Sequence, residues 1–242
     1  IHGSFNGPDP STSWAIHQDK LGVAGSCGTW DAFGKRLCVG DFDNNTLDDL
    51  AVLVAGEPVL NPNGSTTYGA VQVHFSDKLK LRGENDVIVP YYGGSNSYIT
   101  GLSDGALAAG DFDGNGKDEL VIGAPTLTSA GSPGGGTVRV IRCTQTMQFD
   151  LSWLGTKDYF FTDLFDDPVD ANDHFGAALA VGEFTSDGVD DLVIGAPQRD
   201  FANTPSGEPV PGAGVVLILE GNPDGADFGF PSFRAFAEQG DP

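Results

Sequence analysis

Basic residues are scarce in this chain of 242 residues. It carries 12 lysines and arginines against 34 aspartates and glutamates, which gives a formal net charge of −22. This balance excludes nucleic-acid binding, because too few cations are present to neutralise a run of phosphates. The chain also lacks a polybasic stretch that would favour an anionic membrane surface. No window approaches the roughly 18–20 apolar residues that span a bilayer, so we expect no membrane insertion.

Cysteines are few as well. Cys27, Cys38 and Cys143 are too few for a disulfide framework. Cys27 and Cys38 lie close enough in sequence to form one disulfide in an oxidising compartment, and we predict this bridge. Cys143 is then left over, as a buried or an intermolecular thiol. The chain begins at Ile1 without an apolar leader, which fits either a trimmed sequence or a mature, processed chain.

Catalytic patterns are also missing. The four histidines have no clustered partners at ligand spacing, and neither a Gly-x-Ser-x-Gly elbow nor a Walker-type phosphate loop occurs. Carboxylate pairs such as Asp166–Asp167 would suit glycoside hydrolysis. Acidic loops are so common in this chain, however, that such pairs carry little information. We therefore expect a protein that is not an enzyme.

An internal repeat is the main positive feature. Three segments align, each with an apolar strand, a glycine, an acid and an aromatic residue: 37–43, 107–113 and 179–185. The acids Asp41, Asp111 and Glu183 lie 70 and 72 residues apart. Each unit continues with another acid eight residues later, a short apolar run, and then a glycine before β-branched residues. Repeats at a fixed period indicate an array of similar structural units.

The repeat predicts an all-β fold, a β-propeller of four-stranded blades. No stretch sustains a helical period, and the 35 glycines and 15 prolines supply turns between short strands. A period near 70 fits propeller blades better than the shorter repeats of a β-helix, and the aligned acidic loops argue against two unrelated sandwiches. We expect one domain with about three blade units, near 28–98, 99–170 and 171–242, and a leading segment, 1–27, that completes a blade.

Three units are too few for a closed propeller, which typically has about 4–8 blades. Either the two ends of the chain build a shared fourth blade, or the ring is completed by a second copy, by another chain or by further sequence. Open ends would expose strand edges and apolar blade faces. We favour completion by a partner or by further sequence.

The acidic loops carry the strongest chemical signal. Each nonapeptide offers oxygen side chains at positions 1, 3, 5 and 9 and a backbone carbonyl at position 7. The proposed ligands are Asp41, Asp43, Asn45, Leu47 and Asp49; Asp111, Asp113, Asn115, Lys117 and Glu119; Glu183, Thr185, Asp187, Val189 and Asp191. Alternating oxygens on a tight turn suit Ca²⁺ better than Mg²⁺, which demands a stricter octahedron. We predict about three calcium sites.

The three loops are not equivalent. Gly116 and Gly188 occupy position 6, where the chain turns sharply, whereas Thr46 lacks this conformational freedom. We therefore expect the first loop to be distorted. Glu183 and Thr185 replace the first two aspartates in the third loop, which makes it the weakest ligand set. An EF-hand is excluded because flanking helices and a glutamate at position 12 are missing.

These loops and their flanking motifs resemble the FG-GAP repeats of the integrin α-subunit β-propeller. The resemblance rests on the three acidic loops, on Phe33-Gly34 and Phe175-Gly176 before them, and on Gly123-Ala124-Pro125 and Gly195-Ala196-Pro197 after them. Ser103-Asp104 and Leu53-Val54-Ala55 depart from the motif. The resemblance implies a Ca²⁺ site between the first two strands of each blade, on one rim of the propeller.

We expect an extracellular or cell-surface module, secreted or displayed, that is stabilised by calcium and binds a protein or glycan ligand in an adhesion-type interaction. The opposite rim is the expected recognition surface, because loops on a rigid scaffold are the usual place for binding. Its candidate segments are Pro58–Tyr68, Tyr91–Ile99, Thr126–Gly135 and Gln198–Gly212. The alternatives are a lectin-like propeller, an accessory propeller of a secreted hydrolase, and a structural surface or filament subunit.

Overall fold

A computed structural model describes most of the chain. The described residues are 2–4, 7–9, 15–20, 23, 25–60, 64, 66–77, 81, 86–90, 101–128, 131–143, 156–159, 170–200 and 210–223. The elements are β1 (His2–Ser4), β2 (Gly7–Asp9), β3 (Leu37–Gly40), β4 (Asp49–Leu60), β5 (Thr66–His74), β6 (Val87–Pro90), the 3₁₀ turn η2 (Gly101–Asp104), β7 (Leu107–Gly110), β8 (Glu119–Ala124), β9 (Thr137–Ile141), β10 (Thr156–Tyr159), β11 (Ala178–Gly182), β12 (Asp191–Ala196) and β13 (Val215–Leu219). No helix within these residues has the length and apolarity to cross a membrane.

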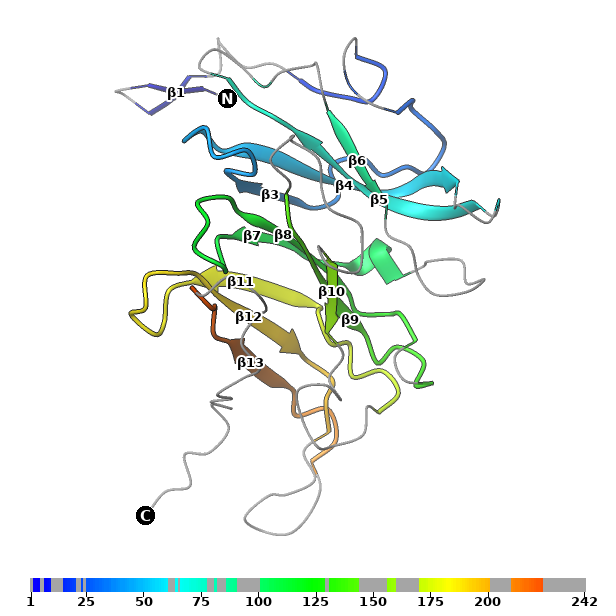
Figure 1. The fold of residues 1–242 in the computed structure, drawn as a ribbon. Coiled ribbons are helices and arrows are strands. Elements are labelled where there is room, and N and C mark those ends of the chain that lie inside the picture. The colour runs from blue at the N-terminus through cyan, green and yellow to red at the C-terminus, as the bar shows by residue number, and fades with distance from the viewer. Residues whose placement is uncertain are drawn as a thin grey trace.

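Three antiparallel sheets follow one another along the chain and stack in sequence order (Figure 1). Blade 1 has the strand order β3-β4-β5-β6, blade 2 β7-β8-β9-β10 and blade 3 β11-β12-β13, and β1 and β2 form a separate hairpin. Each strand pairs with the next one in sequence, as short turns between strands require. The prediction of propeller blades is confirmed, and within the described residues the blades do not close into a ring. The proposed boundaries of the three units stay a prediction.

The core lies between the blades, and strand β8 of the middle blade buries both of its faces. Alternate residues of β8 point in opposite directions. Leu120 and Ile122 join Phe42 and Leu53 in a cluster between blades 1 and 2, whereas Val121 belongs to a second cluster between blades 2 and 3. Burial on both faces explains why these strands are continuous apolar runs rather than alternating ones.

The glycines of the repeat motif allow the blades to approach each other. A Cβ added at Gly123 would lie 2.1 Å from the carbonyl oxygen of Gly176 in the next blade. The amide of Gly176 in turn donates to the carbonyl of Gly195, at 3.0 Å. A glycine before Ala-Pro and a glycine after phenylalanine therefore meet at the blade contact, where no side chain fits.

The predicted disulfide is not present. Cys27, Cys38 and Cys143 are all free, and they are exposed, partly buried and buried respectively. Cys38 packs its side chain against the core between blades 1 and 2, while the amide of the exposed Cys27 donates to Asp19 at 2.9 Å. Cys38 and Cys27 thus have different surroundings in the structure, one against the core and the other exposed. Burial there raises the pKa of the Cys38 thiol to about 12.

Candidate metal centre

The acidic loops all lie at the same edge of the stacked blades. They connect β3 to β4, β7 to β8 and β11 to β12 (Figure 1). In each blade the loop therefore joins the first two strands, which is the position that the resemblance implied.

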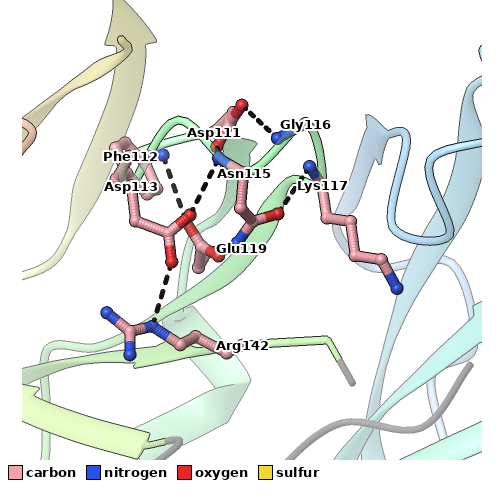
Figure 2. A network of polar contacts seen from close by, with 8 residues as sticks. All are labelled: Asp111, Phe112, Asp113, Asn115, Gly116, Lys117, Glu119 and Arg142. Atoms are coloured by element: carbon pink, nitrogen blue, oxygen red, sulfur yellow. Dashed lines mark hydrogen bonds and ion pairs between the residues drawn. The ribbon is translucent and has the colours of Figure 1, made fainter. Parts of the chain in front are cut away.

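The second loop is folded around its own side-chain oxygens (Figure 2). The two carboxylate oxygens of Asp111 accept hydrogen bonds from the amides of Asn115 at 3.0 Å and Gly116 at 2.8 Å. The amide of Asn115 also donates to Asp113 at 3.2 Å, and the Asn115 side-chain oxygen accepts from the amide of Lys117 at 2.9 Å. The loop thus turns its acidic side chains inward, since each one accepts from amides of the same turn.

Glu119 closes this loop from β8. One carboxylate oxygen accepts from the amide of Phe112 at 3.1 Å, while Oε1 is buried and has no hydrogen-bond partner. Asp111, Asp113 and Glu119 each place a carboxylate oxygen within 4.8 Å of the others. Burial, followed by repulsion from Asp113, raises the pKa of Glu119 to about 8. A buried carboxylate oxygen without a partner is costly, and a bound cation would satisfy it.

The first loop has the same geometry. Asp41, Asp43 and Asp49 gather their oxygens within the same distance, and burial is the main cause that raises the pKa of Asp49 to about 7. Thr46 adopts a left-handed φ of 70° and its amide donates to Asp41 at 2.7 Å, as Gly116 does in the second loop. The expected distortion is therefore wrong: the loop keeps its shape and Thr46 takes up the strain.

The third loop does not gather its acids in this way. Glu183, Thr185 and Asp187 are exposed, and the described residues form metal-type acidic groups only in the first two loops. Asp191 is nevertheless placed like Asp49, accepting from the amides of Phe184 at 2.6 Å and Gly221 at 2.9 Å. The strand end of this loop is formed, while among the described residues no further blade lies beside its outer half.

Sequence reasoning missed two kinds of residue at these loops. Arg142, directly after β9, places Nε 3.3 Å from Asp113 (Figure 2), and no pattern in the sequence pointed to it. The acids at position 8 were overlooked although all three loops have one. Asp118 and Asp190 do not face their own loops, and each binds the backbone of the preceding blade's loop.

Comparison with known proteins agrees with this geometry. The FG-GAP repeat model matches residues 104–141 and 175–219. The chain is 28% identical over 203 residues to integrin alpha-5 of Xenopus laevis, a match that covers 81% of this chain and 16% of that protein. It is 33% identical over 184 residues to integrin alpha-8 of Homo sapiens, which covers 72% of this chain and 15% of that protein.

The chain thus spans about a sixth of the length of the curated relatives that it matches. The two matched repeats contain the second and third acidic loops, and they end with β9 and β13 respectively. The motif, the blade topology and the loop positions agree with one another. The chain is an FG-GAP repeat protein, similar to the integrin alpha subunits.

Proposed function

We propose that this chain is a calcium-stabilised β-propeller module that binds a protein or glycan ligand at the cell surface or outside the cell, without catalysis. The similarity to integrin alpha subunits supports an adhesion-type interaction. Calcium acts structurally: it neutralises the inward-facing carboxylates and holds the rim loops. The stability of the module then depends on free Ca²⁺ by mass action.

One observation supports the metal most directly. Oε1 of Glu119 is buried beside two further carboxylates and has no partner. Arg142 contacts Asp113 at 3.3 Å, so a metal ion would be a second positive charge beside these three carboxylates. Oxygen donors of this kind are those that Ca²⁺ prefers. Asp111, Asp113, Asn115 and Glu119 would hold it, with the carbonyl of Lys117 as a further donor.

Native mass spectrometry of the chain in dilute Ca²⁺, and again after chelation, tests the proposal. We expect two bound ions that chelation removes, and a third, weaker one at the third loop. The variant Glu119→Gln should lose one ion, whereas Asp104→Asn, at an exposed carboxylate outside the loops, should keep them all. A wild-type chain that binds no calcium contradicts the proposal.

The ligand surface is proposed at the rim opposite the metal loops. The β4–β5 and β8–β9 connections lie there, because strands alternate in direction within each blade. The segments Pro58–Tyr68, Thr126–Gly135 and Gln198–Gly212 are described in part, and Tyr91–Ile99 lies outside the described residues. Exchanging these hairpins for short turns should abolish ligand binding and leave calcium binding intact; unchanged ligand binding would refute this placement.

A further inference from the structure

The second acidic loop has a basic side chain against one of its proposed ligands. Arg142 places Nε 3.3 Å from Oδ2 of Asp113 (Figure 2). The other carboxylate oxygen of Asp113 accepts from the amide of Asn115 at 3.2 Å. Both oxygens of this proposed ligand are therefore engaged by groups of the chain itself. The loop belongs to the middle blade, so described blades lie on both sides of it.

The first loop has the amide contact without the basic side chain. Oδ1 of Asp43 accepts from the amide of Asn45 at 3.2 Å, as in the second loop. Within the described part of the chain, no lysine, arginine or histidine forms an ion pair with Asp43. The charged contact thus distinguishes two loops whose turns are folded by the same hydrogen bonds.

The register of the strands shows which position of the blade carries this charge. Arg142 directly follows β9, and Phe75 directly follows β5. The last residues of these two strands pair with Leu120 and Leu50, the equivalent leucines of β8 and β4. Blade 1 therefore has a fully buried phenylalanine where blade 2 has an arginine whose side chain is 30% exposed. An apolar position of one blade is a charged position beside the metal loop in the next.

We propose that Arg142 is an internal counterion of the second loop, which pairs with Asp113 in the metal-free protein and competes there with Ca²⁺. The inference rests on the proposed calcium sites and names the residue that sets the affinity of one of them. Calcium must either displace the guanidinium or share Asp113 with it. In both cases a like charge beside the site opposes the ion. The second loop therefore fills only at a higher free Ca²⁺ concentration than it would with an apolar residue at this position.

The same arginine stabilises the loop when no ion is bound. Asp111, Asp113 and Glu119 bring three carboxylate oxygens within 4.8 Å of one another, and Arg142 supplies a positive charge against their repulsion. Its removal should have two opposite effects: tighter calcium binding and a less stable metal-free protein. A residue that only supported the fold of the loop would show losses in both, since a disordered loop also binds calcium less well.

Arg142→Gln is the primary variant. It is made in the wild type and in an Asp43→Asn background, which weakens the first loop so that titration calorimetry reads the second. We expect the calcium dissociation constant of the second loop to fall about three- to tenfold, because a partly exposed charge is screened by solvent. In chelator, the urea midpoint should fall as well. Arg142→Lys keeps the positive charge and should lie closer to the background protein than Arg142→Gln does in both measurements.

Arg139→Gln is the matched control. It removes an arginine of the same strand that pairs with Ile122 and Asp158 within the sheet, three residues further from the loop, and should leave the calcium affinity unchanged. An affinity that Arg142→Gln leaves unchanged or lowers, or an equal gain in Arg139→Gln, would overturn the role of Arg142 while calcium binding itself remains in place. A wild-type chain that takes up no calcium refutes the metal sites, and this inference with them.

Discussion

Single side chains determine the chemistry of the acidic loops, and Glu119 shows how. It stands where blade 1 has Asp49, its pKa is raised mainly by burial, and one of its oxygens lacks a partner. Each charge that makes the site attractive to a cation also costs stability when the cation is absent. Binding and metal-free stability therefore oppose each other at this residue.

Substituting Glu119 separates these two effects. Glu119→Gln removes a carboxylate that must take up a proton or bury its charge when the chain folds, so the metal-free protein should become more stable at neutral pH. The same change should weaken calcium binding at the second loop by at least about tenfold. Isothermal titration and urea denaturation with chelator measure the two quantities, with Asp104→Asn as the control; a parallel loss of both would contradict this account.

Thr46 stores strain at the first loop. A β-branched residue with a φ of 70° is an outlier, and such strain costs on the order of 1–3 kcal/mol. Thr46→Gly should raise the free energy of unfolding by about 1 kcal/mol, after the greater flexibility of glycine in the unfolded chain is counted. Thr46→Ala keeps the strain and should show no such gain, which makes it the matched control in thermal denaturation.

At the scale of elements, equivalent positions of the repeat have different surroundings. The amide of Gly56 in blade 1 donates to the carbonyl of Asp31, and the amide of Gln198 in blade 3 donates to the carbonyl of Asp173. Each acceptor lies shortly before the first strand of its own blade. The next residues are opposite in charge: Arg199 contacts Asp173 at 2.9 Å, whereas Glu57 lies near Asp31, with a pKa raised by burial and by that neighbour.

This reversal predicts opposite mutational effects. Arg199→Gln leaves the buried Asp173 without its cation and should cost about 3–5 kcal/mol of stability. Glu57→Gln removes a repulsion and keeps a partner for Gln18, whose side chain donates to Glu57 at 2.5 Å, so stability should be unchanged or higher. Urea denaturation at pH 7 compares the two, and equal losses would show that the positions are equivalent after all.

The phenylalanines of the loops form a second matched pair. Phe112 is 1% exposed between blades, and Phe112→Ala should cost about 3–5 kcal/mol. Phe184 is 59% exposed, and Phe184→Ala in the monomer should change stability by no more than about 0.5 kcal/mol. Denaturation at protein concentrations below any self-association tests this; a large loss at Phe184 would mean that the side chain is already buried within one chain.

For the molecule as a whole, the raised pKa values link stability to pH. Asp49 titrates at about 7 and Glu119 at about 8 in the folded protein, above their usual values of about 3.9 and 4.3. Their contribution is fully present below about pH 4 and is lost as the pH rises through 7–8. In the metal-free protein we therefore expect unfolding to become easier from pH 5 to pH 8.

Calcium should reverse this trend, because binding requires the deprotonated carboxylates. Urea denaturation at several pH values, with chelator and with Ca²⁺, measures both slopes. The double variant Asp49→Asn and Glu119→Gln should flatten them, since it removes the titrating groups. Parallel slopes in chelator and in Ca²⁺ would show that these carboxylates do not bind the ion.

The sequence by itself determined the repeat, the order of strands, the position of each loop between the first two strands, and which residues offer oxygens. These features are local: they follow from the spacing of glycines, acids and β-branched residues within about twenty positions. Family membership follows from the same local motifs.

Only the tertiary structure decided which loops gather their acids, that Cys38 faces the core, that Asp118 and Asp190 bind the preceding blade, and that Phe184 is left exposed. The contacts of Asp118 and Asp190, for example, join residues of neighbouring blades that lie 77 and 79 positions apart in the sequence. Equivalent motifs therefore differ in burial and in their partners, because both depend on the residues that pack against the motif.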